Sequence, residues 1–262
     1  AGDKLVLPGT NQSLTSTDSY VGQWETPTLA SASGTQLGLT GGFAFAHRGG
    51  RSASGALTFL PHVGNITRNI TIRSQNPAGT RGHVLLTDRA EVDIRYVGFR
   101  DLGRTLITPL DSTRLDGTGH ATHIGTNQIG RYSLHLHHLF GPASPAANSY
   151  QYVLMGNAID GGSKWGITIH NTHYGLVQDN VVYNYNGASI ATEDGSESFN
   201  VFDHNFALRG MGEPDERDSN PPAQARMAMG TEGVGFWFRG PNNFIRNNVA
   251  ANFQNPTSEA AY

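Results

Sequence analysis

Short runs that alternate apolar and polar residues, or that are rich in β-branched residues, recur along the whole chain. Five of the clearest are NITRNITIRS (65–74), EVDIRYVGF (91–99), YSLHLHH (132–138), GITIH (166–170) and NFIRNNVA (243–250). Few windows carry apolar residues at helical spacing without an interrupting Gly, Pro or Asn. The pattern therefore predicts an all-β protein.

The second half of the chain also has an internal repeat, in which a Gly opens one short apolar run and an Asn follows the next. Asn180 and Asn205 are 25 residues apart, and Gly166 and Gly187 are 21 apart. Sixteen of the twenty Asn lie after residue 126, which suits a ladder of Asn side chains at turns. A period of this length predicts a right-handed parallel β-helix, which is a solenoid. The alternative is an antiparallel sandwich, which is disfavoured because Asn-Gly and Asp-Gly hairpin turns do not recur.

Three segments differ in character. Residues 1–60 are rich in Gly, Ser and Thr and are expected to form an irregular N-terminal cap or the first coils, with the β-helix over 61–262. Residues 209–230 are polar and contain Pro, so we expect a long loop leaving the stack, of the kind that often borders a binding groove. The chain begins without Met and ends soon after a strand-like run, so we expect a processed chain or a piece of a longer one.

Composition excludes several classes of function. The net charge is -3 with 15% charged residues, which argues against a nucleic-acid partner. The chain has no Cys, so disulfides, thiolate nucleophiles and Cys-ligated metals are excluded. No stretch approaches the roughly 18 apolar residues of a membrane span. The oligomeric state stays open, because the end of a β-helix can be covered in several ways.

Candidate chemistry is concentrated in a cluster of histidines, since seven of the eleven His lie between residues 120 and 173. If Leu134 and Leu136 point into the core, His135 and His137 point outward together. The same alternation in the next three runs turns Thr168 and Ala191 outward and turns these residues inward: Ile167, Ile169, Ile190, Phe236 and Phe238. Successive coils stack about 4.8 Å apart. The predicted outer column reads His137, His170, Glu193 and Arg239, with His135 beside it.

Three interpretations of this group of side chains are open. It can hold a divalent metal ion, with His135, His137, His170 and Glu193 as ligands. Imidazole ligands favour a transition metal, whereas calcium prefers oxygen and would bind elsewhere. It can instead exchange protons with a substrate, or it can be a column of stacked polar residues that only satisfy one another or solvent.

The motifs GTNQIGRYSLHLHH, ITIHNTHYGLVQDNVVYNYNGASIATEDGSE and VFDHNFA resemble, in order and spacing, the β-helix family that includes the cell-migration-inducing and transmembrane hyaluronidases. The resemblance covers residues 60–208 with specific motifs. It implies a parallel β-helix, an extracellular setting and, for the animal members, depolymerisation of hyaluronan, in some cases with calcium. The residues that fall in its motifs are Arg131, His135, His137, His170, Glu193 and Asp194.

The expected function is therefore that of a secreted polysaccharide hydrolase acting on an acidic or N-acetylated glycan. Glu193 is expected to be the general acid, with Asp194 or a metal-activated water supplying the other half of the reaction. Adjacent residues of a strand point to opposite sides, so this pairing needs a turn at Asp194. The full expected set is Glu193, Asp194, His170 and Arg131 as catalytic residues, and Arg239 and His173 as substrate-binding residues.

Two other functions remain open at this point. A polysaccharide lyase would remove the proton next to a uronate carboxylate, which Arg131 or Arg239 would neutralise with a cation. A non-catalytic β-helix would bind glycans or serve as a surface structure, and its metal ion would only hold the coils together.

Overall fold

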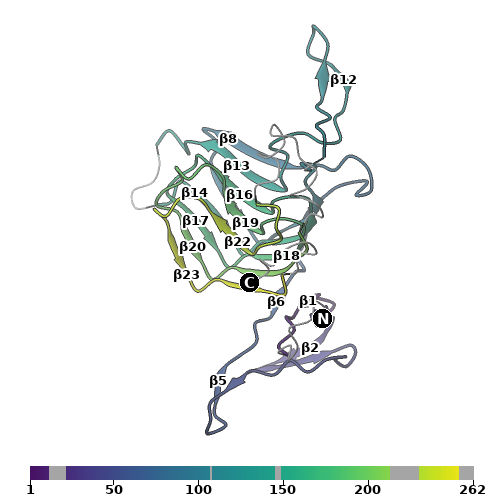
Figure 1. Ribbon diagram of the computed structural model, residues 1–262, viewed down its shortest axis with the longest axis vertical. Coiled ribbons are helices and arrows are strands. Elements are labelled where there is room, and N and C mark those ends of the chain that lie inside the picture. The colour runs from purple at the N-terminus through teal and green to yellow at the C-terminus, as the bar shows by residue number, and fades with distance from the viewer. Residues whose placement is uncertain (12–21, 107, 145–148, 213–229, 254–262) are drawn as a thin grey trace. The chain divides into compact units, whose positions relative to one another are not determined.

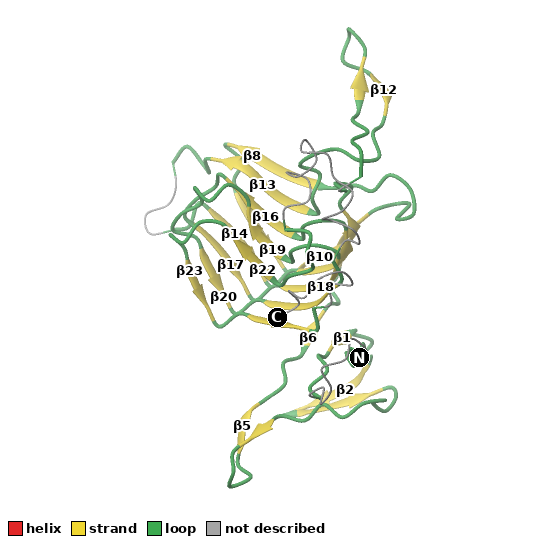
Figure 2. Ribbon diagram, viewed as in Figure 1, coloured by secondary structure: helices red, strands yellow, loops and turns green. Residues whose placement is uncertain are grey.

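The computed structural model describes residues 1–11, 22–106, 108–144, 149–212 and 230–253. The chain forms two compact units, Ala1–Thr67 and Arg68–Tyr262. Every regular element among the described residues is a strand (Figure 2). Within these residues, no helix has the length and apolar character needed to cross a membrane.

The larger unit is built from three parallel sheets that run side by side (Figure 1). Sheet 1 contains β8 (Val84–Asp88), β13 (Leu134–Leu139), β16 (Ile167–His170), β19 (Ile190–Thr192) and β22 (Phe236–Phe238). Sheet 2 contains β9 (Val92–Arg95), β14 (Tyr152–Met155), β17 (Gly175–Gln178), β20 (Val201–Asp203) and β23 (Phe244–Arg246). Sheet 3 contains β7 (Ile70–Arg73), β10 (Val97–Leu102), β15 (Ala158–Gly162), β18 (Val181–Tyr185), β21 (Phe206–Gly210) and β24 (Val249–Ala251).

The chain passes from sheet 1 to sheet 2 to sheet 3 in each coil, and each strand pairs in parallel with the equivalent strand of the next coil. This architecture confirms the predicted right-handed parallel β-helix and excludes the antiparallel sandwich. The segment 213–229, which holds most of the predicted loop, lies outside the described residues. The stack continues beyond it, because β19 pairs directly with β22.

Apolar side chains at alternate positions along the strands of sheet 1 pack into the core. Leu134, Leu136, Ile167, Ile169 and Ile190 are fully buried in one apolar cluster, as predicted. Burial of each such side chain contributes about 1.5–3 kcal/mol. The predicted inward residues of the last coil, Phe236 and Phe238, pack against this cluster but remain partly exposed.

A ladder of asparagines follows the corner between sheets 2 and 3. The Nδ2 of Asn157 donates to Oδ1 of Asn180 (3.0 Å), Asn180 donates to Asn205 (2.9 Å), and Asn205 donates to Asn248 (2.9 Å). The 25-residue spacing predicted such a ladder, and the structure confirms it. A second, shorter ladder joins Asn200 to Asn243 at the corner between sheets 1 and 2.

Antiparallel strand pairs form the smaller unit, and one antiparallel hairpin extends from the coils of the larger unit. In the smaller unit, the pairs are β1 (Leu5–Val6) with β6 (Gly64–Asn65), β2 (Leu29–Ser33) with β3 (Gln36–Leu39), and β4 (Gly50–Arg51) with β5 (Leu57–Phe59). Because β6 pairs with β1, the residues just after position 60 lie with this unit. In the larger unit, β11 (Arg114–Leu115) and β12 (Ala121–His123) form a hairpin between β10 and β13.

Candidate functional site

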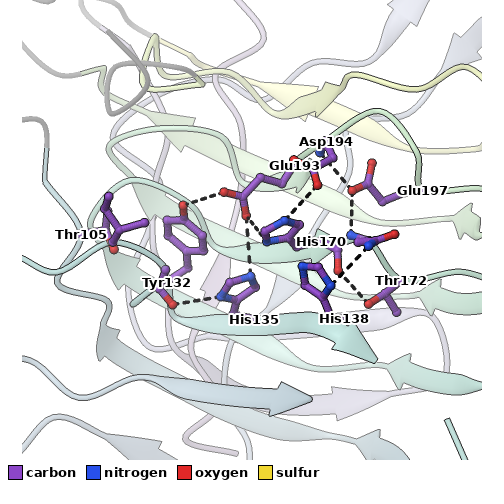
Figure 3. Close-up of polar contacts among 12 residues, drawn as sticks. Thr105, Tyr132, His135, His138, His170, Thr172, Glu193, Asp194 and Glu197 are labelled. Carbon is purple, nitrogen blue, oxygen red and sulfur yellow. Dashed lines mark hydrogen bonds and ion pairs between the residues drawn. The ribbon is translucent and has the colours of Figure 1, made fainter. Parts of the chain in front are cut away.

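The histidine cluster lies on the outer face of sheet 1, where three successive coils bring their side chains together (Figure 3). His137 on β13 pairs with His170 on β16. Glu193 follows β19, and its N–H donates to the carbonyl of Ile169 (2.9 Å). The predicted column of His137, His170 and Glu193 is confirmed, because regular alternation over buried leucines and isoleucines fixes the register.

His135 is buried, although it points away from the core, because aromatic side chains cover it. The Tyr132 ring packs against it at 4.8 Å between centroids, and Tyr132 packs in turn against Trp165. The Nδ1 of His135 lies 2.9 Å from the carbonyl of Gly130, so this nitrogen carries the proton and donates it. Burial is the main cause that lowers the pKa of His135 to about 4, so the ring is neutral and its Nε2 is an acceptor.

Carboxylates flank both nitrogens of His170. Nε2 lies 3.0 Å from Oδ2 of Asp194, and Nδ1 lies 3.1 Å from Oε2 of Glu193, although the latter two atoms are not aligned for a hydrogen bond. Burial lowers the pKa of His170, but the neighbouring Glu193 and Asp194 outweigh burial, and the net direction is upward. The two carboxylates thus orient the ring with one nitrogen toward each of them.

Glu193 lies at the centre of the cluster. Its Oε1 accepts a hydrogen bond from the hydroxyl of Tyr132 (3.1 Å), and its Oε2 lies 3.7 Å from Nε2 of His135. Burial raises the pKa of Glu193, but His170, His135 and the Tyr132 hydroxyl outweigh burial and lower it. Glu193 is therefore a carboxylate at neutral pH, which suits a metal ligand better than the general acid expected from the sequence.

Three atoms of this cluster point at one another without a hydrogen bond among the described residues. These atoms are Nε2 of His135, Nδ1 of His170 and Oε2 of Glu193, and all three are buried. They lie within 4.8 Å of one another. With His170 neutral and its proton on Nε2, toward Asp194, all three atoms are acceptors, and a metal cation, a second proton on His170 or a donating water would satisfy them.

A divalent transition metal fits this arrangement. Two imidazole nitrogens and one carboxylate oxygen form a donor set typical of zinc and related ions. The other nitrogen of each ring is held by an acceptor, the Gly130 carbonyl for His135 and Asp194 for His170. Metal-binding histidines are commonly oriented in this way.

The predicted fourth ligand, His137, belongs to a second group of nitrogens, which it forms with His138 and His170. His138 has a positive φ of 51°, and the pairing of β13 with β8 shifts register between His137 and Leu139. This bulge lets Leu139 return to the core, while His138 packs against the rings of His137 and His170. Strict alternation would turn His138 inward, so the sequence pattern does not point to it as a ligand.

The turn that the sequence requires at Asp194 is present. β19 ends at Thr192, and Gly195 has a φ of +89°. The buried carboxylate of Glu197 accepts hydrogen bonds from the N–H groups of Asn171 (2.9 Å), Asp194 (3.0 Å) and Gly195 (2.8 Å). This clamp holds both Asp194 and the segment after His170, so the two adjacent acidic residues reach the same ring.

Sequence reasoning missed Glu197 and Tyr132 as parts of the site. Glu197 is the third acidic residue of the EDGSE run, and a carboxylate three residues beyond a turn is a usable signal for such a clamp. Tyr132 stands inside the GRY motif, but its role depends on Glu193, which lies 61 residues away along the chain. No local pattern reports such a contact.

The remaining predicted residues lie around the cluster. Arg239 donates from Nη1 to the backbone carbonyl of Glu193 (2.9 Å) and lies over the Trp237 ring. His173 accepts from the N–H of Ser198 (3.1 Å), so its ring holds a turn. The guanidinium of Arg131 donates to the carbonyl of Ile129 (3.3 Å) rather than to a residue of the cluster. The substrate and catalytic roles of these three side chains stay predictions.

Comparison with known proteins assigns the chain to a family whose fold agrees with the parallel coils. Residues 103–257 match the family model described as CEMIP beta-helix. The chain is 26% identical over 211 residues to human cell surface hyaluronidase CEMIP2, covering 73% of this chain and 14% of that protein. It is 28% identical over 158 residues to the human cell migration-inducing and hyaluronan-binding protein, covering 53% of this chain and 11% of that protein.

A third relative is mouse fibrocystin-L, which is 33% identical over 126 residues, covering 47% of this chain and 2% of that protein. The chain thus spans only a small part of each of these relatives. The family model, however, covers more than half of this chain, and the matched segment contains His135, His170 and Glu193. On this basis, together with the parallel coils described above, the chain belongs to the CEMIP β-helix family.

Proposed function

We propose that this chain is the β-helix of an extracellular enzyme that hydrolyses an acidic or N-acetylated glycan similar to hyaluronan, at a metal site formed by His135, His170 and Glu193. The observation that carries the proposal is the convergence of three buried acceptor atoms without hydrogen bonds. Such atoms destabilise a fold unless a cation, a proton or a donating water lies between them. A cation explains their retention on a face that also carries solvent-accessible acidic and basic groups.

The glycan class and the extracellular setting rest on the relatives. One is named a cell surface hyaluronidase and another a hyaluronan-binding protein. Sequence identity of 26–28% supports a shared fold more strongly than a shared reaction, since one fold often carries several chemistries. The geometry of the site therefore supports hydrolysis, and the family supports the class of glycan.

A bound divalent cation would supply Lewis acidity and lower the pKa of water. Residues of the chain would orient the ligands, contact the sugar and transfer protons. Asp194 holds the Nε2 of His170, and its carboxylate is about half exposed, so it can also reach a sugar on the outer face. His137 is partly exposed beside it and is the second titratable group in a position to move a proton.

A metal site that only stabilises the fold is the second candidate function. It is favoured by one specific observation: the three ligand residues come from three successive coils, so an ion would cross-link the stack. In that case removal of the ion would lower the thermal stability, and no glycan would be cleaved.

Product analysis tests the proposal. The zinc-loaded chain is incubated with hyaluronan, chondroitin and a neutral polysaccharide, and chain length and unsaturated ends are followed together. We expect shorter, saturated hyaluronan chains from the wild type and a loss of about a hundredfold or more in Glu193→Gln. Asp179→Asn, which changes an exposed carboxylate on another corner of the coils, is the matched control and should keep full activity.

Each other outcome has a definite meaning. Unsaturated products would replace hydrolysis with elimination and make the protein a lyase. An absence of shortening in a folded, zinc-loaded protein would leave the stabilising metal site as the better function.

A further inference from the structure

A second cluster of ionisable groups, distinct from the metal ligands, lies where the chain enters the first two coils. The Nη1 of Arg104 lies 3.0 Å from the carbonyl oxygen of Arg81 and 3.0 Å from Nδ1 of His83. The backbone N–H of Arg104 donates to the carbonyl of Arg131 (2.8 Å). Arg104, His83 and Arg131 form what we call the arginine cluster.

The arginine cluster carries positive charge without a counter-ion. No carboxylate of the described residues lies within 4.0 Å of the charged nitrogens of Arg81, Arg104 or Arg131. Burial and the charge of Arg131 both lower the pKa of Arg104. Burial, Arg104 and Arg131 lower the pKa of His83 to about 4, so His83 is neutral at pH 7 and its Nδ1 accepts the hydrogen bond from Arg104.

One donor of the arginine cluster is left unused. The Nε of Arg104 is buried and has no hydrogen-bond partner among the described residues. A guanidinium presents its donors in a rigid fork that matches the two oxygens of a carboxylate. An anion beside this guanidinium would offset the repulsion between the two arginines.

The arginine cluster lies close to the metal site, beside the outer face of sheet 1, where β8 and β13 begin. His83 immediately precedes β8, and by register it lies two residues before Leu85, the partner of His135. Strand geometry then places the Cα atoms of His83 and His135 about 8 Å apart. Arg131 is also the neighbour of Tyr132, whose hydroxyl donates to Glu193. A glycan lying along this face would meet both clusters.

We propose that Arg104 and Arg131, with His83 as a neutral acceptor that orients Arg104, form a subsite for the carboxylate of a uronate sugar. The inference rests on the proposed function and extends it, because it requires the glycan to carry a carboxylate next to the bond that is cleaved. It assigns to the arginine cluster the choice between acidic and neutral chains. The metal ligands retain the chemistry.

Binding without turnover tests the subsite. The full chain is titrated, in the presence of a chelator, with short hyaluronan oligosaccharides and with the same oligosaccharides after reduction of their carboxylates to alcohols. We expect the wild type to bind the acidic form about tenfold or more tightly than the reduced form. Arg104→Gln and Arg131→Gln should each lose most of this preference, and Arg246→Gln, on sheet 2, should keep it.

Two further variants separate binding from folding. Arg104→Lys keeps the charge but loses the fork, so its preference should fall between those of the wild type and Arg104→Gln. If Arg104→Gln does not fold, as judged by its thermal unfolding, Arg131→Gln carries the test, because among the described residues the guanidinium of Arg131 makes one hydrogen bond, which is exposed, to Ile129.

The subsite is overturned if the wild type binds the acidic and reduced oligosaccharides equally, or if folded Arg104→Gln and Arg131→Gln keep the wild-type preference. This failure is distinct from failure of the proposed hydrolysis. Carboxylate-dependent binding without cleavage would refute the hydrolase and retain the subsite. Cleavage of hyaluronan that is insensitive to these variants would do the reverse.

Discussion

The asparagine ladder and the histidine cluster are both stacks of polar side chains repeated from coil to coil, but they differ in how their hydrogen bonds balance. In the ladder, the Oδ1 of Asn180 accepts from both the backbone N–H and the Nδ2 of Asn157 (3.0 Å each). The Nδ2 of Asn180 donates to Asn205 (2.9 Å) and to the carbonyl of Leu154 (3.0 Å). An amide has donors and acceptors on one group, so identical residues can satisfy one another.

The histidine cluster cannot balance in this way. A neutral imidazole has one donor and one acceptor, and in His135 the donor is already used by the Gly130 carbonyl. The acceptor then faces a carboxylate, Glu193, which has no proton to give. The comparison teaches that repetition alone does not identify function. A surplus of acceptors in a buried place points to an added donor or a cation, and two imidazoles with a carboxylate are a donor set that suits a metal ion.

The largest expected effect follows from that surplus. Zinc at a thousand times its dissociation constant should stabilise the wild type by about 4 kcal/mol, because it binds the folded site and not the unfolded chain. His170→Asn should lose this stabilisation, since it removes one ligand nitrogen and the partner of Asp194. Thermal unfolding at increasing zinc concentration measures both.

The ladder provides the control for this measurement. Asn205→Asp should respond to zinc as the wild type does, whatever its own stability. An equal response in His170→Asn would mean that zinc binds somewhere other than the histidine cluster.

Much of the fold was predictable because it depends on local alternation. The outward pair His137 and His170 followed from the buried positions on either side of each, and the ladder followed from a 25-residue spacing. The core of a solenoid repeats the same short-range rule in every coil. A single sequence is enough to apply that rule.

The site was less predictable, because its details break the rule. The bulge at His138 reverses the alternation, and a histidine signals the positive φ that allows it only weakly, because most histidines have a negative φ. Thr168 and Ala191, expected to face outward, are fully buried. Tyr132 and Trp165 form an aromatic cluster with Ala191 on that outer face, and its members come from separate coils.

The next effect in size is on stability and concerns the ladder. Asn180→Ala leaves the backbone N–H and one Nδ2 hydrogen of Asn157 buried without an acceptor, and it removes one hydrogen bond each from the carbonyl of Leu154 and from Oδ1 of Asn205. Each such group costs about 1–3 kcal/mol, so we expect the free energy of unfolding to fall by about 3 kcal/mol. Urea denaturation measures this fall.

The ladder variant should nevertheless bind zinc normally where it is folded. Asn180→Asp restores the acceptor, but it places a buried carboxylate oxygen opposite the acceptors of Leu154 and Asn205, so its loss should be at least as large as that of Asn180→Ala. If Asn180→Ala weakened zinc binding as much as His170→Asn does, the two stacks would not be independent, and the distinction drawn between them would be wrong.

The smallest expected effect is on the pH dependence of stability. The asparagine ladder does not contribute to this dependence, because asparagine side chains do not titrate. His83 has a pKa of about 4 in the folded chain, against an ordinary value of 6.5, because of burial and the nearby Arg104 and Arg131. Between these two values the unfolded chain binds a proton that the folded chain does not. The stabilisation is therefore present above pH 6.5 and is lost as the pH falls toward 4.

After allowance for solvent screening, this loss should be about 1 to 2 kcal/mol. Urea denaturation in steps of pH, with chelator present throughout, measures it. His83→Asn should flatten this part of the profile relative to the wild type, because asparagine keeps a polar group beside Arg104 but cannot take up the proton. His120→Asn, on the exposed hairpin of β11 and β12, should leave the profile unchanged. A profile that stays equally steep in His83→Asn would assign the pH dependence to other groups and remove the argument that His83 is held neutral by the two arginines.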